Sequence, residues 1–124
     1  MYKKSEKLRE LGEKVIHTHI DLLSHIIEQD IYIEYLECDK PKLKDGRRIW
    51  ADTERVKEKY DALYPMDFII TFYGGDVPKD KIETLMLHEL LHVGWEDGKA
   101  KIRPHDVQDF KVIVDKLGTD WMEG

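Results

Sequence analysis

Two histidines and a glutamate form the most informative cluster in the sequence, His88-Glu89-Leu90-Leu91-His92. On a helix, residues four positions apart lie on the same face, about one turn from each other. Both imidazoles can therefore bind a single Zn²⁺ at about 2.0–2.1 Å. The glutamate beside the first histidine can accept a proton from a zinc-activated water without displacing it. The pattern predicts hydrolysis of a peptide bond, with Glu89 as the general base.

A catalytic zinc ion usually has three protein ligands and one open position. His105 is the only histidine that follows His92 in the sequence. The interval between them contains Gly94, Gly98 and Pro104, which favour turns that could bring the chain back. We therefore expect His105 to be the third zinc ligand.

Further polar residues could support this site. Asp106 and Asp109 are expected to accept a hydrogen bond from the far N–H of a ligating imidazole, or else to be solvated helix charges. The reaction also needs a group that stabilises the developing oxyanion, and the sequence does not choose among the candidates. These candidates are Tyr64, Tyr73, Trp95 and Arg103.

Helices are expected to carry most of these residues. Apolar residues at helical spacing predict a long helix over residues 4–29, the histidine helix over 79–94 and a last helix over 105–117. A short helix is expected after Asp52 or Thr53, because either residue can cap it.

Strands are expected between the helices, where β-branched and aromatic residues cluster. They cover residues 31–37, 47–51 and 68–73, with a turn at Asp45-Gly46. The sequence thus predicts one α+β domain over residues 1–124, with about three strands packed against helices on one side.

Three segments resemble the putative phage metallopeptidase family: residues 67–72, the histidine cluster at 88–92, and residues 105–110. The tail at 118–121 is also similar. More distantly, the chain resembles the SprT-like (Spartan-type) zinc proteases, in which a third histidine precedes a phenylalanine. The resemblance implies a minimal zincin-like fold and a zinc site of three histidines. It also implies that the strand over 68–73 lines the cleft at a sheet edge, where it would pair with an extended peptide. The alternative for these residues is an ordinary buried strand.

Composition excludes several other classes of protein. The 124 residues include 20 Lys and Arg against 26 Asp and Glu, a net charge of −6, which argues against general binding to nucleic acid. No zinc ribbon or basic tail is visible, so a DNA–protein crosslink protease is not expected. No apolar run approaches the ~18 residues that span a bilayer, and no signal peptide is visible. The single cysteine, Cys38, favours the cytoplasm, which would be that of the host if a phage or prophage encodes the chain.

One alternative function remains open at this stage. A zincin-like fold with a structural zinc could engage a host protein without cleaving it, although a structural site needs no general base. The other histidines, His17, His19 and His25, are expected at the surface or partly buried, though a second metal site is imaginable. The lysine-rich segment 40–48 is expected to be a solvated loop.

Overall fold

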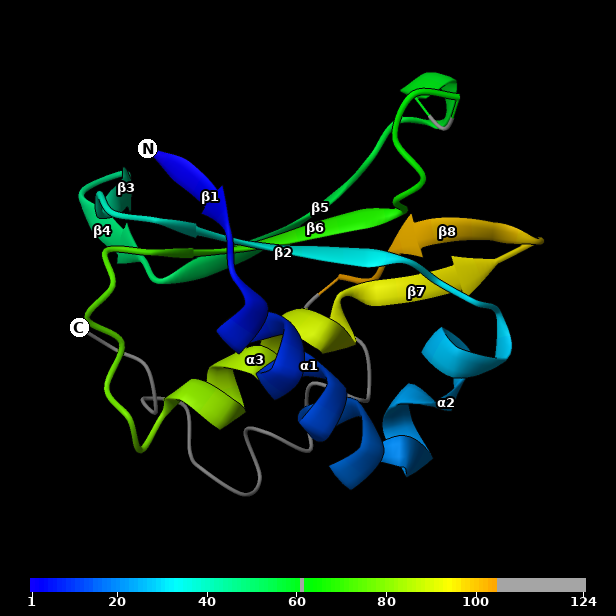
Figure 1. Ribbon diagram of the computed structural model, residues 1–124, viewed down its shortest axis with the longest axis horizontal. Coiled ribbons are helices and arrows are strands. Elements are labelled where there is room, and N and C mark those ends of the chain that lie inside the picture. The colour runs from blue at the N-terminus through cyan, green and yellow to red at the C-terminus, as the bar shows by residue number, and fades with distance from the viewer. Residues whose placement is uncertain (61, 105–124) are drawn as a thin grey trace.

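The central element of the computed structural model, which describes residues 1–60 and 62–104, is a four-stranded sheet in the order β1-β2-β6-β5 (Figure 1). β2 and β6 are parallel, and the two outer pairs are antiparallel. The strands are β1 (Tyr2–Lys4), β2 (Ile33–Cys38), β5 (Ala51–Arg55) and β6 (Phe68–Tyr73). The α+β class is thereby confirmed, but the sheet has four strands instead of about three. The strand predicted over residues 47–51 is not a single element, because residues 47–49 lie outside this sheet and Ala51 begins β5.

Three helices cover one face of this sheet, as Figure 1 shows. They are α1 (Glu6–Thr18), α2 (Ile20–Glu28) and α3 (Ile82–Leu91). A 3-10 turn covers Glu58–Tyr60. The helix expected over residues 105–117 lies outside the described residues, as do His105, Asp106 and Asp109.

The single long N-terminal helix is a wrong prediction. Residues 2–4 form β1, and the helical segment divides into α1 and α2 at His19. The Thr18 hydroxyl donates a hydrogen bond to the Lys14 carbonyl at 2.8 Å, a pattern that bends helices. On α2, Ile20 and Ile27 are exposed, whereas Leu23 and Ile26 are buried, so part of the apolar surface expected to be buried by a long helix is left exposed.

The cap expected at Asp52 or Thr53 is also wrong, because both residues belong to strand β5, and the short helix expected after them is reduced to the 3-10 turn at Glu58–Tyr60. Pairing along the whole of β6, from Ala51 opposite Phe72 to Arg55 opposite Phe68, outweighs the local capping preference. β6 itself matches its predicted bounds, but it lies between β2 and β5. The expectation that it forms a sheet edge is therefore wrong, and the alternative of a buried strand is confirmed; among the described residues, β1 and β5 are the two outer strands.

Two hairpins extend from the core, and both turn at an Asp-Gly pair. β3 (Lys42–Lys44) and β4 (Arg47–Ile49) meet at Asp45-Gly46, and β7 (Val93–Glu96) and β8 (Lys99–Ile102) meet at Asp97-Gly98. All four turn residues have positive φ, as a tight two-residue hairpin turn requires. The lysine-rich segment is thus a hairpin, contrary to the predicted loop.

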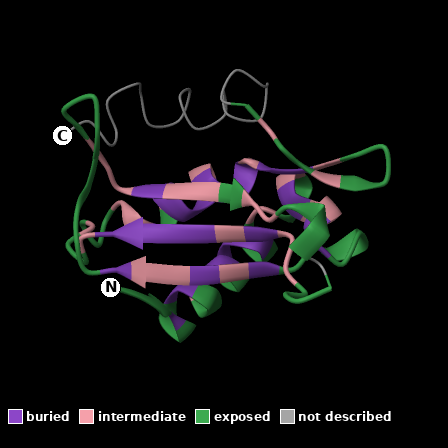
Figure 2. Cartoon of the chain, turned by 90° about the horizontal axis from the view of Figure 1, so that it is seen from above, coloured by how far each residue is buried: buried purple, intermediate pink, exposed green. Residues whose placement is uncertain are grey.

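The core lies between the sheet and the helices, and Figure 2 shows the buried positions along the strands. α1 approaches β2 closely at Gly12, where an added Cβ would lie 2.4 Å from the Tyr35 hydroxyl oxygen. Alanine favours an isolated helix over glycine by about 1 kcal/mol. Here it would not fit, because the Tyr35 ring occupies the space, and this contact explains the glycine within the helix.

Candidate metal centre

Helix α3 carries His88, is capped at its C-terminal end by His92, and is buried on most of its surface. Leu85, Met86, Leu87, Leu90 and Leu91 are all buried in the core. A helix that is apolar nearly all round packs on several sides at once. In the C-terminal half of α3, His88 and the capping residue His92 are only partly buried. The core therefore holds the backbone of the cluster, and the imidazoles are left at a cavity wall.

The two imidazoles adopt a geometry that suits one metal ion. Their ring centroids are 5.2 Å apart, with an interplanar angle of 83°. Two imidazoles bound to one tetrahedral Zn²⁺ at about 2.0–2.1 Å would have centroids about 5 Å apart. The pair in the described residues therefore fits a zinc ion without a large movement of either side chain.

The β7–β8 hairpin returns the chain to His92. α3 ends at Leu91 instead of residue 94, and β7 begins directly after His92. The Arg103 N–H donates to the His92 carbonyl at 2.8 Å, and the His92 Nδ1 lies 2.8 Å from the Arg103 carbonyl oxygen. A carbonyl only accepts, so Nδ1 carries the proton. Nε2 then has the lone pair that a metal ligand needs.

Glu89 is buried beside this pair and is held by strand β5. It is 4% exposed, and the Thr53 hydroxyl donates to its Oε1 at 2.8 Å. Thr53 also lies 3.1 Å from the Glu89 carbonyl oxygen. Burial raises the pKa of Glu89 to about 7, the Thr53 hydrogen bond opposes this, and the nearby Asp52 charge adds to it. A carboxyl group with this pKa can accept and release a proton near neutral pH.

A cavity of about 550 Å³ opens at this cluster. Helix α3 contributes both histidines, Glu89 and Leu85, and the outer strand β5 contributes Ala51 and its neighbours. The β3–β4 hairpin and β8 supply the rest. The remaining lining residues are Lys42, Lys44, Arg48, Ile49, Trp50, Asp52, Thr53 and Ile102.

The predicted oxyanion candidates do not line this cavity among the described residues. Tyr73 is buried, and its hydroxyl donates to Asp52 Oδ2 at 3.0 Å. Burial, with the adjacent Asp52 charge, raises the pKa of Tyr73 above its usual range. Arg103 is bound through its backbone to His92, Tyr64 is exposed in the loop before β6, and Trp95 packs against the core.

The N-terminal histidines are separated by the break between α1 and α2. His17 is exposed on α1, whereas the His25 Nε2 on α2 lies 2.7 Å from the Val93 carbonyl oxygen. His25 therefore ties α2 to the start of β7. Within residues 1–60 and 62–104, no three His, Cys, Asp or Glu side chains are grouped to hold a metal ion. In that part of the chain, nothing supports the second metal site.

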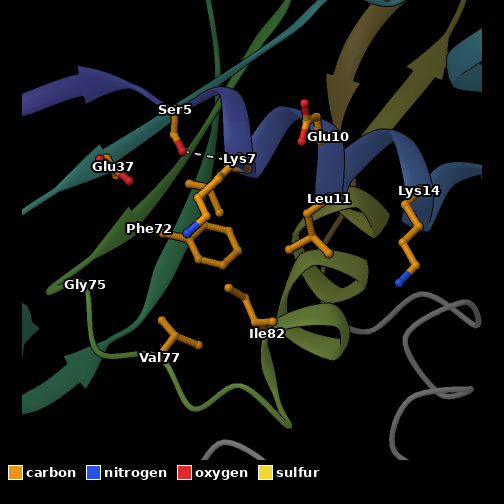
Figure 3. A pocket seen from close by; sticks show the side chains of 11 residues that line it. Ser5, Lys7, Glu10, Leu11, Lys14, Glu37, Phe72, Gly75, Val77 and Ile82 are labelled. Atoms are coloured by element: carbon orange, nitrogen blue, oxygen red, sulfur yellow. Dashed lines mark hydrogen bonds between the residues drawn. The ribbon is translucent and has the colours of Figure 1, made fainter.

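A second cavity, of about 530 Å³, shares no lining residue with the first. Figure 3 shows Leu11, Phe72, Val77 and Ile82 directed into it from α1, β6, the segment before α3 and the first turn of α3, respectively. Its charged residues, which include Lys7 and Glu37, are of both signs. None of its lining residues is a histidine or a cysteine. We therefore place the candidate site at the first cavity.

These features define an α+β domain with a histidine pair and a buried carboxyl group at one cavity. The chain belongs to the putative phage metallopeptidase family, whose model matches residues 1–123. The name of this family suggests a peptidase that uses a metal and acts on proteins or peptides. No curated protein and no solved structure matches the chain. In the part of the chain that the structure describes, no helix has the length and apolar character needed to cross a membrane.

Sequence reasoning missed the contribution of β5 to this site. Thr53 was expected to cap a helix, yet its hydroxyl binds Glu89, which is 36 residues away in the sequence. No sequence spacing connects the two residues. They meet because β5 pairs with β6 and α3 packs against β5. A correct prediction of a strand over residues 51–55 would have been the only indication in the sequence that Thr53 belongs to the site.

Proposed function

We propose that this protein is a zinc-dependent peptidase, with His88, His92 and His105 as metal ligands and Glu89 as general base. The main support is the combination of the histidine pair, whose spacing fits one zinc ion, with a buried carboxyl group whose pKa is raised to about 7. Zn²⁺ at this site would lower the pKa of a water molecule and polarise the substrate carbonyl. A binding module would need no such carboxyl group.

The proton is transferred by the free oxygen of Glu89. Thr53 occupies Oε1, and within the described residues the structure gives no hydrogen bond to Oε2. Oε2 would take the proton from the attacking water and then pass it to the leaving amine. Glu89 thus acts first as a base and then as an acid, while Thr53 keeps its carboxylate in one orientation.

The third ligand is supported by the path of the chain. The Arg103 backbone is hydrogen-bonded to His92, and His105 is two residues further along. Two residues span at most about 7 Å, which keeps His105 within reach of the histidine pair. We propose Asp106 and Asp109 as acceptors that orient a ligating imidazole, as in the sequence-based expectation.

The outer strand β5 is the proposed support for an extended substrate. The Tyr73 N–H donates to the Trp50 carbonyl, and the Val56 N–H donates to the Asp67 carbonyl. In an antiparallel ladder these directions alternate, so the backbone groups of Ala51 and Thr53 point away from β6. A peptide could pair with that open edge directly beside Glu89.

Removal of the metal tests this function. We expect the purified full-length protein to hydrolyse unstructured peptides, to lose this activity after chelation, and to regain it with about one equivalent of Zn²⁺. Peptide cleavage followed by mass spectrometry measures the effect. Zinc-loaded protein that binds peptides and leaves them intact would contradict the proposal and favour a binding module.

Replacing Thr53 with valine should lower kcat for peptide hydrolysis about tenfold, because a hydrogen bond to a charged group contributes about 1.5–3 kcal/mol. Valine preserves the shape and the strand preference of threonine. The Thr53→Ser variant retains the hydroxyl and should retain most of the activity. Equal losses in the two variants would assign Thr53 a packing role instead of a positioning role.

A further inference from the structure

One wall of the candidate cleft is basic, although the chain as a whole carries a net charge of −6. Lys42, Lys44 and Arg48 line the cavity, and all three belong to the β3–β4 hairpin. The acidic residues that line it are Asp52 and Glu89, and Glu89 is the proposed base. This wall of the cleft is therefore positively charged, whereas the molecule as a whole is negatively charged.

The three cationic side chains differ in whether a nearby carboxylate neutralises their charge. The Lys42 ammonium lies 2.5 Å from Asp52 Oδ2, and Arg48 is paired with Asp76. Asp76 does not line the cavity. Lys44 is exposed, and the described residues offer it no ion pair. Lys44 is thus the cation best placed to meet a charge brought by a ligand.

The same wall is rich in hydrogen-bond donors. The Arg48 guanidinium lies over the Trp50 ring, 3.7 Å from its centroid. Arg48 Nε and Trp50 Nε1 are buried without an acceptor among the described residues. On the hairpin side of the cavity, the polar side chains of Lys42, Lys44, Arg48 and Trp50 are all donors. A ligand rich in acceptors, such as a carboxylate, complements such a wall.

We infer that this cleft selects peptides with an acidic side chain near the scissile bond, and that Lys44 contacts that side chain. The inference rests on the proposed function, since it names the substrate class of the same site. A peptide along the open edge of β5 would pass Thr53, beside Glu89, and then Ala51 and Trp50 next to the hairpin. The acidic side chain would thus lie about two residues from the scissile bond, on the side of the hairpin.

Peptide series provide the test. Zinc-loaded full-length protein is given otherwise identical peptides with Glu, Gln or Lys at each position around the cleaved bond, and kcat/KM is measured. We expect about a fivefold preference for Glu over Gln at one position, near the upper range for a single exposed ion pair. The preference should shrink in 0.5 M NaCl, because salt screens exposed charges.

Charge variants identify the contact. Lys44→Gln should abolish the preference, and Lys44→Glu should reverse it toward Lys. Arg47→Gln is the matched control, because Arg47 pairs with Lys44 across the hairpin but does not line the cavity. That variant should keep the wild-type preference, and an equal loss in it would overturn the assignment to Lys44.

Binding separates this inference from the proposed function. Fluorescence anisotropy with the zinc-loaded Glu89→Gln variant measures the affinity of the Glu and Lys peptides without cleavage. If the zinc-loaded wild-type protein cleaved no peptide, while binding to the Glu89→Gln variant still showed a Glu preference that depends on Lys44, the inference would be supported and the peptidase contradicted. Equal cleavage or equal binding of both peptides would overturn the inference and leave the peptidase intact. Tighter, Lys44-dependent binding of a single-stranded oligonucleotide would also overturn it.

Discussion

Replacing Glu89 with glutamine is expected to abolish peptide hydrolysis while the protein remains folded and binds zinc. Loss of a general base lowers kcat by about 10²–10⁴-fold. Glutamine has nearly the same shape, and its side-chain oxygen can still accept the hydrogen bond that Thr53 donates to Oε1. The loss would therefore be chemical in origin. Peptide cleavage and zinc content, measured on the same preparation, provide the check.

The burial of Glu89 sharpens this prediction. Because burial raises the pKa of its carboxyl group, the charged form is the costly one in the metal-free protein. The neutral glutamine side chain avoids that cost, so the metal-free variant should be at least as resistant to heating as the wild type. Glu83→Gln, on the exposed side of α3, is a suitable control and should cleave peptides normally. A Glu89→Gln protein with wild-type kcat would remove Glu89 from the mechanism.

The second large effect is expected at the metal ligands. Replacing His88 or His92 with alanine should lower zinc affinity by more than about a hundredfold, since loss of a residue that merely orients a ligand already costs about 10–100-fold. His105→Ala should have an effect of the same order. Zinc competition with a chromophoric chelator, at fixed pH, measures all three variants. Peptide hydrolysis should fall with zinc occupancy.

His17→Ala is the matched control for these variants, because His17 is exposed on α1. It should bind zinc like the wild type. His92→Ala also removes the hydrogen bond to the Arg103 carbonyl, so the melting temperature of each metal-free variant must be compared. If His105→Ala retained full zinc affinity, another residue would have to be the third ligand. Wild-type affinity in His88→Ala would contradict the site as a whole.

Local sequence patterns were sufficient to predict the helices, strands and turns whose own residues indicate the structure. The period of the apolar residues around His88 predicts α3, and the continuous apolar run predicts β6 at its observed bounds. Asp45-Gly46 marks a turn because few other pairs tolerate positive φ at two successive positions. The first helix was misjudged, because apolar periodicity does not show where a helix bends.

In the candidate site, too, some features follow from the local sequence and others depend on the tertiary structure. The sequence by itself predicted that His88 and His92 lie together, because residues four apart share one face of a helix wherever the helix lies. Only the tertiary structure decided that β5 is an outer strand beside the cleft, that Thr53 holds Glu89, and that the basic hairpin lines the cleft. These contacts join residues far apart in the chain. They depend on sheet order and burial, which local propensity does not encode.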